Sequence, residues 1–216
     1  MDNSKHLEDI KDIKNMMDKA TRFSSLSGIS IVLAGTLAVI GGFIIYSDLE
    51  FFLQDGKLIG YSGLIEGEAG KEDLNRKIKL LVSVGAILFS ISFLSFYFSG
   101  LRKSKKQQVE FWNSSMKRAL RALFVPVLSG GVFSVMLINQ GYVGMIAPAT
   151  LIFYGLGLIS ASKFTYGDIE ILGYVQLVLG LISSFFMGYG LLFWVTGFGI
   201  CHIIFGLIFF FKYDRK

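Results

Sequence analysis

Long apolar blocks separated by short polar segments dominate the pattern of hydrophobic and polar positions along this chain. A membrane-spanning helix needs about 20 mostly apolar residues, and six blocks meet this requirement. Charged side chains occur only at the ends of these blocks, at Lys79, Arg121 and Glu170. The pattern therefore predicts an all-α polytopic membrane bundle of six transmembrane helices, with spans over residues 24–46, 78–100, 119–138, 143–161, 169–187 and 190–211.

The segments outside the spans complete the predicted organisation. Residues 1–23 predict an amphipathic cytoplasmic helix, because apolar residues recur there at steps of three and four: Leu7, Ile10, Ile13, Met17 and Ala20. Its five acidic residues disfavour an anionic membrane surface. We therefore expect residues 5–23 to dock on the bundle itself, on a protein partner or on a second copy of the chain in a homo-oligomer. Residues 47–77 predict an external loop, and residues 212–216 predict a cytoplasmic tail.

The basic residues are divided unequally between the two sets of loops that six spans create. Sixteen of the 21 Lys and Arg residues fall on the side of both termini, and the remaining five fall on the other side. Because basic residues favour the cytoplasmic side, both termini are predicted to be cytoplasmic, in a bacterial inner membrane. This topology accounts for the net charge of +5, so we expect the lipid bilayer as a partner and no nucleic acid. The basic cluster at 101–121 also suits anionic lipid head groups.

Small residues form rows with a seven-residue period in four of the spans. A seven-residue step returns to nearly the same helix face, and small side chains allow helices to approach closely within lipid. We therefore expect the first, second, fifth and sixth spans to pack tightly; the alternatives are a chance arrangement of the 25 glycines or glycines that line a pore. The rows are Gly28, Gly35 and Gly42; Gly85, Ser92 and Ser99; Gly173 and Gly180; Gly190 and Gly197; Gly199 and Gly206.

Four polar side chains of interest fall inside the predicted spans: Tyr154, Tyr174, Gln176 and His202. At about 1.5 Å of rise per residue, Tyr154, Gln176 and His202 lie at one depth, roughly 10 to 13 Å from the cytoplasmic ends of their spans. An unsatisfied polar group in hydrocarbon costs several kcal/mol, so we hypothesise a hydrogen-bonded node of these three residues. A purely structural contact between helices is favoured, and a ligand pocket or a pH-sensitive switch through His202 are the alternatives.

The types of residue in the spans argue against several classes of protein. A coupled transporter or an intramembrane hydrolase needs ionisable groups that these spans lack. One cysteine, Cys201, and one mid-span histidine fall short of the three or four ligands of a metal site, so neither a metal nor a cofactor is expected. The favoured function is a non-enzymatic scaffold or sensor that acts through a partner or self-association. The alternative is a channel or carrier for a small neutral or lipidic solute, and an interfacial enzyme using Asp168, Glu170 or His202 is the weakest hypothesis.

Several short motifs carry a resemblance. They are LEDIK at 7–11, RFSSLSG at 22–28, FYGLGLISASKFT at 153–165, LGY at 172–174, GYGLLFW at 188–194 and GFGICHI at 197–203. On these motifs the chain resembles a family of uncharacterised six-span integral membrane proteins of Bacteroidetes-type bacteria. The resemblance covers most of the chain and implies six spans in a bacterial inner membrane. It implies no activity, substrate or catalytic residue.

Overall fold

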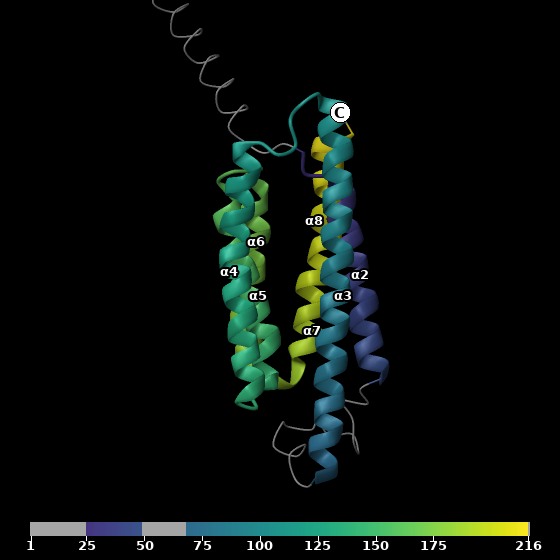
Figure 1. The fold of residues 1–216 in the computed structure, drawn as a ribbon, viewed down its shortest axis with the longest axis vertical. Helices are drawn as coiled ribbons and strands as arrows, with labels where there is room; N and C mark the ends of the chain where they lie inside the picture. Colours follow the sequence, from purple (N-terminus) through teal and green to yellow (C-terminus); the bar gives the residue numbers. More distant parts are fainter. Residues whose placement is uncertain (1–24, 49–67, 216) are drawn as a thin grey trace, which may run out of the picture.

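The computed structural model describes residues 25–48 and 68–215, and these residues form an all-α bundle (Figure 1). Six of its helices are long and apolar enough to cross a membrane. The chain is therefore a multi-pass membrane protein, and the predicted six-span helical fold is confirmed. The predicted amphipathic helix within residues 1–23 and most of the predicted external loop lie outside the described residues.

The first five spans are ordinary α-helices. They are α2 (Gly28–Asp48), α3 (Glu68–Gln107), α4 (Ser114–Asn139), α5 (Ile146–Ser162) and α6 (Asp168–Phe185). Single short turns, η2 (Val143–Met145) and η3 (Met187–Tyr189), precede α5 and the sixth span.

The sixth span, Gly190–Asp214, is one continuous helix that we call the C-terminal helix. Its hydrogen bonding changes twice from the α pattern to the wider π pattern, in which each bond spans five residues. Its parts are α7 (Gly190–Trp194), the π segment η4 (Val195–Cys201), α8 (His202–Phe209) and the π segment η5 (Phe210–Asp214).

Several helices extend beyond the predicted spans: α3 continues to Gln107 and α4 begins at Ser114. Two further extensions reach into the segments predicted as a loop and a tail. Helix α3 begins at Glu68, so the last part of the predicted loop 47–77 is helical. The predicted tail 212–216 is helical as far as Asp214. Hydropathy marks where a helix leaves the apolar layer and not where its backbone hydrogen bonds end, so polar residues with adequate helix propensity extend both helices.

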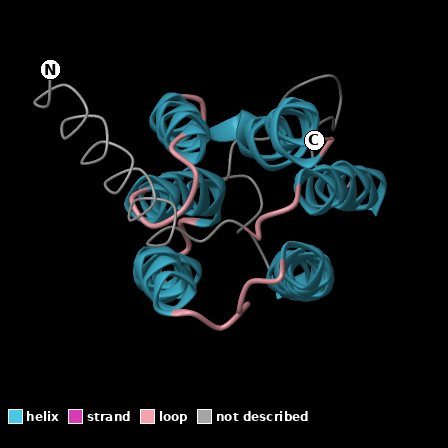
Figure 2. Ribbon diagram, turned by 90° about the horizontal axis from the view of Figure 1, so that it is seen from above, coloured by secondary structure: helices cyan, strands magenta, loops and turns pink. Residues whose placement is uncertain are grey.

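The six spans are arranged as two groups of three (Figures 1 and 2). Helix α5 packs against both α4 and α6, and these three form the group that we call the central half. Helix α2 packs against both α3 and the C-terminal helix, and these three form the terminal half. The first turns of the C-terminal helix also contact α5 and α6, so this helix joins the two halves.

Glycines permit the closest contact in the terminal half, between α2 and the C-terminal helix. A methyl group placed on Gly35 would lie 2.7 Å from the carbonyl oxygen of Gly199, and one on Gly28 would lie 2.7 Å from that of Gly206. One on Gly42 would overlap the side chain of Val195. The two helices are antiparallel, so rows with the same seven-residue step meet along their whole length. At Gly28 and Gly35 the two backbones approach to a distance that leaves no room for a side chain.

A second glycine contact joins α5 to α6 in the central half. A methyl group on Gly173 would lie 2.9 Å from the carbonyl oxygen of Gly155, and one on Gly180 would lie 2.9 Å from the backbone nitrogen of Ile152. The row in the second span behaves differently, because a methyl group on Gly85 would meet nothing within 4 Å. Tight packing of α3 through Gly85, expected from the sequence, is therefore not what the structure has.

Candidate functional site

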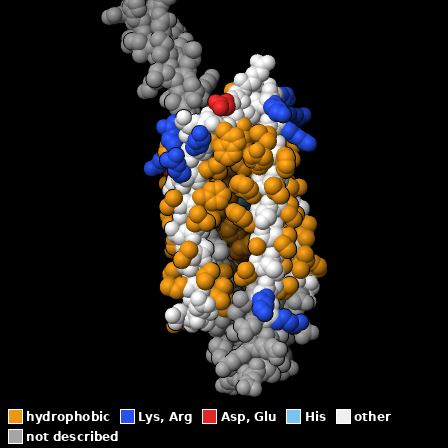
Figure 3. All heavy atoms as spheres, in the orientation of Figure 1, with side chains coloured by type: hydrophobic (Ala, Val, Ile, Leu, Met, Phe, Trp, Pro, Cys, Tyr) orange, Lys and Arg blue, Asp and Glu red, His pale blue; other side chains and the backbone are white. Residues whose placement is uncertain are grey.

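A cavity of about 1140 Å³ lies between the central and terminal halves. Residues from all six spans line it, and they reach from Ile45 and Tyr142 near one end of the bundle to Leu26 and Thr165 near the other. Asp, Glu, Lys and Arg are absent from this lining, which is apolar over most of its area. Figure 3 shows a hollow bordered by hydrophobic side chains on the face where α3 and α4 lie. The cavity is therefore an apolar space inside the membrane-spanning part of the protein.

Small residues on facing helices leave this space open. Gly85 of α3 and Gly131 of α4 both line the cavity, and a methyl group on either would meet nothing within 4 Å. The hydroxyl groups of Ser134 and Thr150, also in the lining, donate to carbonyl oxygens of their own helices, at 2.8 and 2.9 Å. These hydroxyls are satisfied locally, so they do not require water in the cavity.

Three aromatic rings bridge α3 and α4 beside the cavity. The ring of Phe124 lies edge-on to those of Phe89 and Phe93, with centroids 6.4 and 6.0 Å apart. All three rings line the cavity. Nearer the connecting loop, Met116 and Phe111 form a buried cluster with residues of α3. Both contacts between α3 and α4 are made by side chains, which can change rotamer without breaking a helix.

The structure brings together the three residues of the hypothesised polar node. The hydroxyl oxygen of Tyr154 lies 3.0 Å from Nε2 of His202, and Nε2 of Gln176 lies 3.4 Å from Nδ1 of the same imidazole. Tyr154 and His202 also line the cavity, whereas Gln176 is fully buried behind them. Tyr174 does not join the node, because it is half exposed and donates to Glu170 of its own helix at 3.1 Å.

A fourth group, the carbonyl oxygen of Gly197, completes the node. Nε2 of Gln176 donates to this oxygen at 2.7 Å, and Nδ1 of His202 lies 2.9 Å from it. Gly197 belongs to the π segment η4, so both side chains reach the backbone of the C-terminal helix where its hydrogen bonding departs from the α pattern. The sequence predicted Gly197 only as a packing residue. The pair of glycines at 197 and 199, mid-helix, was the available signal of an unusual backbone.

These distances determine the tautomer of His202. If Nδ1 lacked a proton, two acceptors, Nδ1 and the Gly197 oxygen, would face each other at 2.9 Å. The proton therefore sits on Nδ1 and is donated to Gly197, and Nε2 accepts from the hydroxyl of Tyr154. The side chain of Gln176 then offers its remaining oxygen, Oε1, to no hydrogen-bond donor. This oxygen lies close to Gly197: a methyl group placed on Gly197 would be only 2.6 Å from it.

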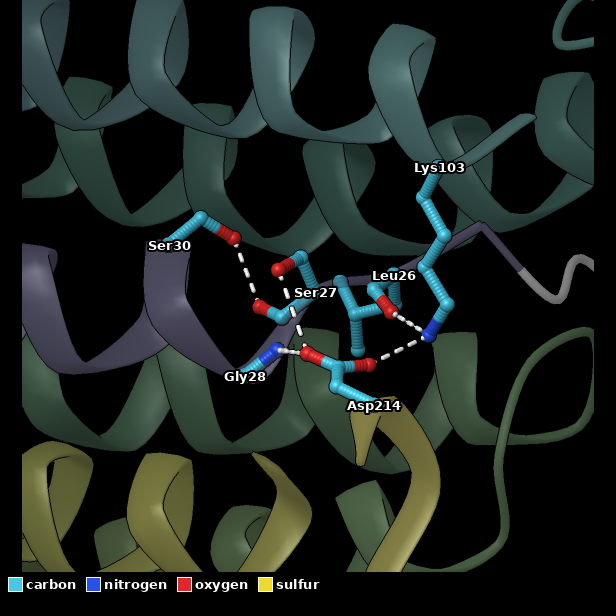
Figure 4. A network of polar contacts seen from close by, with 6 residues as sticks. All are labelled: Leu26, Ser27, Gly28, Ser30, Lys103 and Asp214. Atoms are coloured by element: carbon cyan, nitrogen blue, oxygen red, sulfur yellow. Dashed lines mark hydrogen bonds and ion pairs between the residues drawn. The ribbon is translucent and has the colours of Figure 1, made fainter. Parts of the chain in front are cut away.

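A separate polar cluster joins the start of α2, the end of the C-terminal helix and Lys103 of α3 (Figure 4). Oδ1 of Asp214 lies 2.6 Å from Nζ of Lys103, and both side chains are almost buried, at 10% and 12% exposure. Oδ2 of Asp214 accepts from the backbone nitrogen of Gly28 at 2.7 Å, at the start of α2, and from Ser27 at 3.2 Å. Lys103 also donates to the carbonyl oxygen of Leu26 at 2.5 Å. Asp214 thereby neutralises both a lysine and the positive end of a helix dipole.

Tyr166 lies beside this cluster, in the turn between α5 and α6. Its ring contacts those of Phe209 and Tyr213, with centroids 4.9 and 4.4 Å apart, and Lys103 lies over its face at 5.7 Å. Burial, followed by the negative charge of Asp214 and the neighbouring Tyr213, raises the pKa of Tyr166 to about 12. The sequence did not single out Lys103, Asp214 or Tyr166 as partners, since nothing in their spacing indicates that they meet.

Comparisons with known proteins add no further constraint. The chain matches no family model, no curated protein and no solved structure. Over residues 25–48 and 68–215, no group of three or more His, Cys, Asp and Glu residues is placed to hold a metal ion. The cavity and the node beside it are therefore the features from which a function can be argued.

Proposed function

We propose that this protein takes a long-chain, lipid-like molecule from the bilayer into the cavity between its two halves and acts as a carrier for it. The cavity is the observation that carries this proposal. The cavity has a volume of about 1140 Å³ and opens on a face of the bundle that would contact lipid. Hydrocarbon covers its apolar walls better than water does, by about 25 cal/mol for each Å² of apolar surface removed from water.

The chemistry of the lining selects the kind of occupant. Water needs two to four polar partners for each molecule, and the apolar walls offer few. A hydrocarbon chain needs none. The volume exceeds the roughly 300–1,000 Å³ of pockets for drug-sized ligands and suits a molecule with a long chain. Since the hollow lies on the side of α3 and α4 that would face lipid, membrane lipid is the nearest source of such a chain.

The sequence favoured a scaffold or sensor over a carrier for a neutral or lipidic solute. A scaffold needs no internal cavity, so the cavity supports the alternative, and self-association stays a prediction. The proposed carrier is not an enzyme. We also infer from the distribution of basic residues that both termini are cytoplasmic and that the membrane is a bacterial inner membrane. The resemblance to six-span proteins of Bacteroidetes-type bacteria agrees with this location and stays a prediction too.

The fluorescence of Trp194 provides a test, because this residue lines the cavity and the chain has only two tryptophans. In a Trp112→Phe background, a long alkane brominated at mid-chain should quench Trp194 in a saturable manner. The double variant Gly85→Phe, Gly131→Phe places two rings in open space and should remove the saturable part. Quenching that never saturates and is the same in the filled variant would overturn the proposal.

A matched control separates filling of the cavity from a general effect of added rings. Ile87 and Val132 lie on the same two helices, are 57% and 73% exposed, and do not line the cavity. The double variant Ile87→Phe, Val132→Phe should therefore quench as the parent does.

We expect a ligand to enter the cavity between α3 and α4, where the rings of Phe89, Phe93 and Phe124 contact one another. Replacing Phe124 by Ala removes both ring contacts and should speed the onset of quenching in a stopped-flow measurement, by about tenfold. Val125→Ala, at a neighbouring position that is 65% exposed and outside the lining, should leave the rate unchanged. Equal rates in the two variants would exclude this route.

A further inference from the structure

The wall of the cavity carries one polar pair whose hydrogen-bonding capacity is defined. The hydroxyl of Tyr154 donates its only proton to Nε2 of His202, at 3.0 Å. It can donate no second bond, and its remaining lone pair can only accept. Whatever polar group a ligand places against Tyr154 must therefore bring its own proton.

Three contacts hold the pair in this state. His202 is 95% buried, at 5% exposure, and its Nδ1 proton is committed to the Gly197 carbonyl at 2.9 Å. Gln176 holds the same carbonyl from the other side at 2.7 Å. The ring of Phe198 stacks on His202, with centroids 5.9 Å apart, and prevents the imidazole from rotating freely. The tautomer cannot change without leaving the Gly197 oxygen facing a second acceptor.

The lining also restricts the charge of a ligand. A carboxylate or phosphate in this space would face no Lys or Arg, and an ammonium group would face no Asp or Glu. A charge without a partner in such surroundings is strongly disfavoured. Ser92 of α3 also lines the cavity, and a serine hydroxyl can donate to or accept from an uncharged polar group.

We propose that the cavity selects a neutral long-chain lipid with a hydroxyl group, and that this hydroxyl donates to Oη of Tyr154. This inference rests on the proposed function, because it assumes that a lipid-like chain enters the cavity. It adds a class of ligand: lipid alcohols are preferred over ethers, esters and ketones, whose oxygens would meet the Tyr154 lone pair without a proton between them.

The test compares three molecules that share the same long chain, brominated at the same position: an alcohol, its methyl ether and the alkane without the oxygen. Saturable quenching of Trp194 in the Trp112→Phe background gives an affinity for each. One hydrogen bond contributes about 0.5–1.5 kcal/mol, so the alcohol should bind roughly three- to tenfold more tightly than the ether. Equal affinities of alcohol and ether would overturn this inference and leave the proposed function standing. Quenching by none of the three in a saturable manner would overturn the proposed function itself.

Two variants locate the preference at the polar pair. Tyr154→Phe removes the accepting oxygen, and the alcohol should lose its three- to tenfold advantage while the affinity of the ether is unchanged. His202→Phe keeps a ring of similar shape and releases the Tyr154 proton, so the ether should gain affinity. If the preference for the alcohol survives both substitutions, another group recognises the hydroxyl, and the assignment to Tyr154 is wrong.

Discussion

Tyr154 and His202 are 48 residues apart in the chain, and their side chains meet at 3.0 Å on the wall of the cavity. The contact joins α5 of the central half to the C-terminal helix of the terminal half. Its direction, from the Tyr154 hydroxyl to the imidazole, follows from the protonated Nδ1 that faces Gly197. A carbonyl in a π segment thus determines what the cavity presents to a ligand.

Gln176 should stabilise the fold through this carbonyl. Gln176→Leu removes the donor at 2.7 Å from Gly197, and the free energy of unfolding should fall by about 1–2 kcal/mol. Chemical unfolding in micelles measures the change. Ser184→Ala, which removes only a hydroxyl that bonds to its own helix, is the matched control and should stay within about 0.5 kcal/mol of the parent. Equal stability of the two variants would contradict a stabilising role for Gln176.

The contact between α2 and the C-terminal helix should tolerate no side chain at Gly35. Gly35→Ala places a methyl group 2.7 Å from a backbone oxygen, and two helices must separate to accept it. We expect a loss of about 1–3 kcal/mol. Gly131→Ala makes the same substitution in open space and should stabilise the helix by up to about 1 kcal/mol. Melting temperatures of the two variants should move in opposite directions; a shift in the same direction would refute the close contact.

Removing one partner of the ion pair between Lys103 and Asp214 should destabilise the fold strongly, because the charge of the other partner stays nearly buried. Lys103→Met leaves Asp214 buried without its cation and should cost about 3–5 kcal/mol. The double variant Lys103→Met, Asp214→Asn should lose much less than the sum of the two single variants. Lys105→Met, at an exposed position on the same helix, is the control. Additive losses in the double-mutant cycle would show that the two side chains do not interact.

Deprotonation of the Tyr166 phenol should destabilise the fold at high pH. Its pKa is raised from 10.0 to about 12, so the folded protein holds the phenol proton more tightly than the unfolded chain does. The stabilisation is complete below about pH 10 and is lost as the pH rises from about 10 to about 12. Melting temperatures across this range should fall more steeply for the parent than for Tyr166→Phe. Tyr189→Phe, at an exposed position, should behave as the parent; identical curves for all three proteins would rule out the effect.

The three side chains of the polar node were visible in the sequence. Depth along a helix depends only on the rise per residue, so Tyr154, Gln176 and His202 could be placed at one level before any contact was known. Their contact needed the rotation of each helix about its axis, which a span of uniform hydrophobicity does not reveal. Tyr174, two residues from Gln176 on the same helix, is half exposed, whereas Gln176 is fully buried.

The sequence by itself determined the six spans, because hydrocarbon demands about 20 apolar residues for each crossing. It also indicated the glycine rows that join α2 to the C-terminal helix. Only the tertiary structure decided that Gly85 faces an open space while Gly35 faces a backbone. The physical reason is that a small residue permits either close packing or a void, and the partner across from it decides which. The cavity, the π-segment carbonyl of Gly197 and the pairing of Lys103 with Asp214 all depend on such partners, which no local pattern encodes.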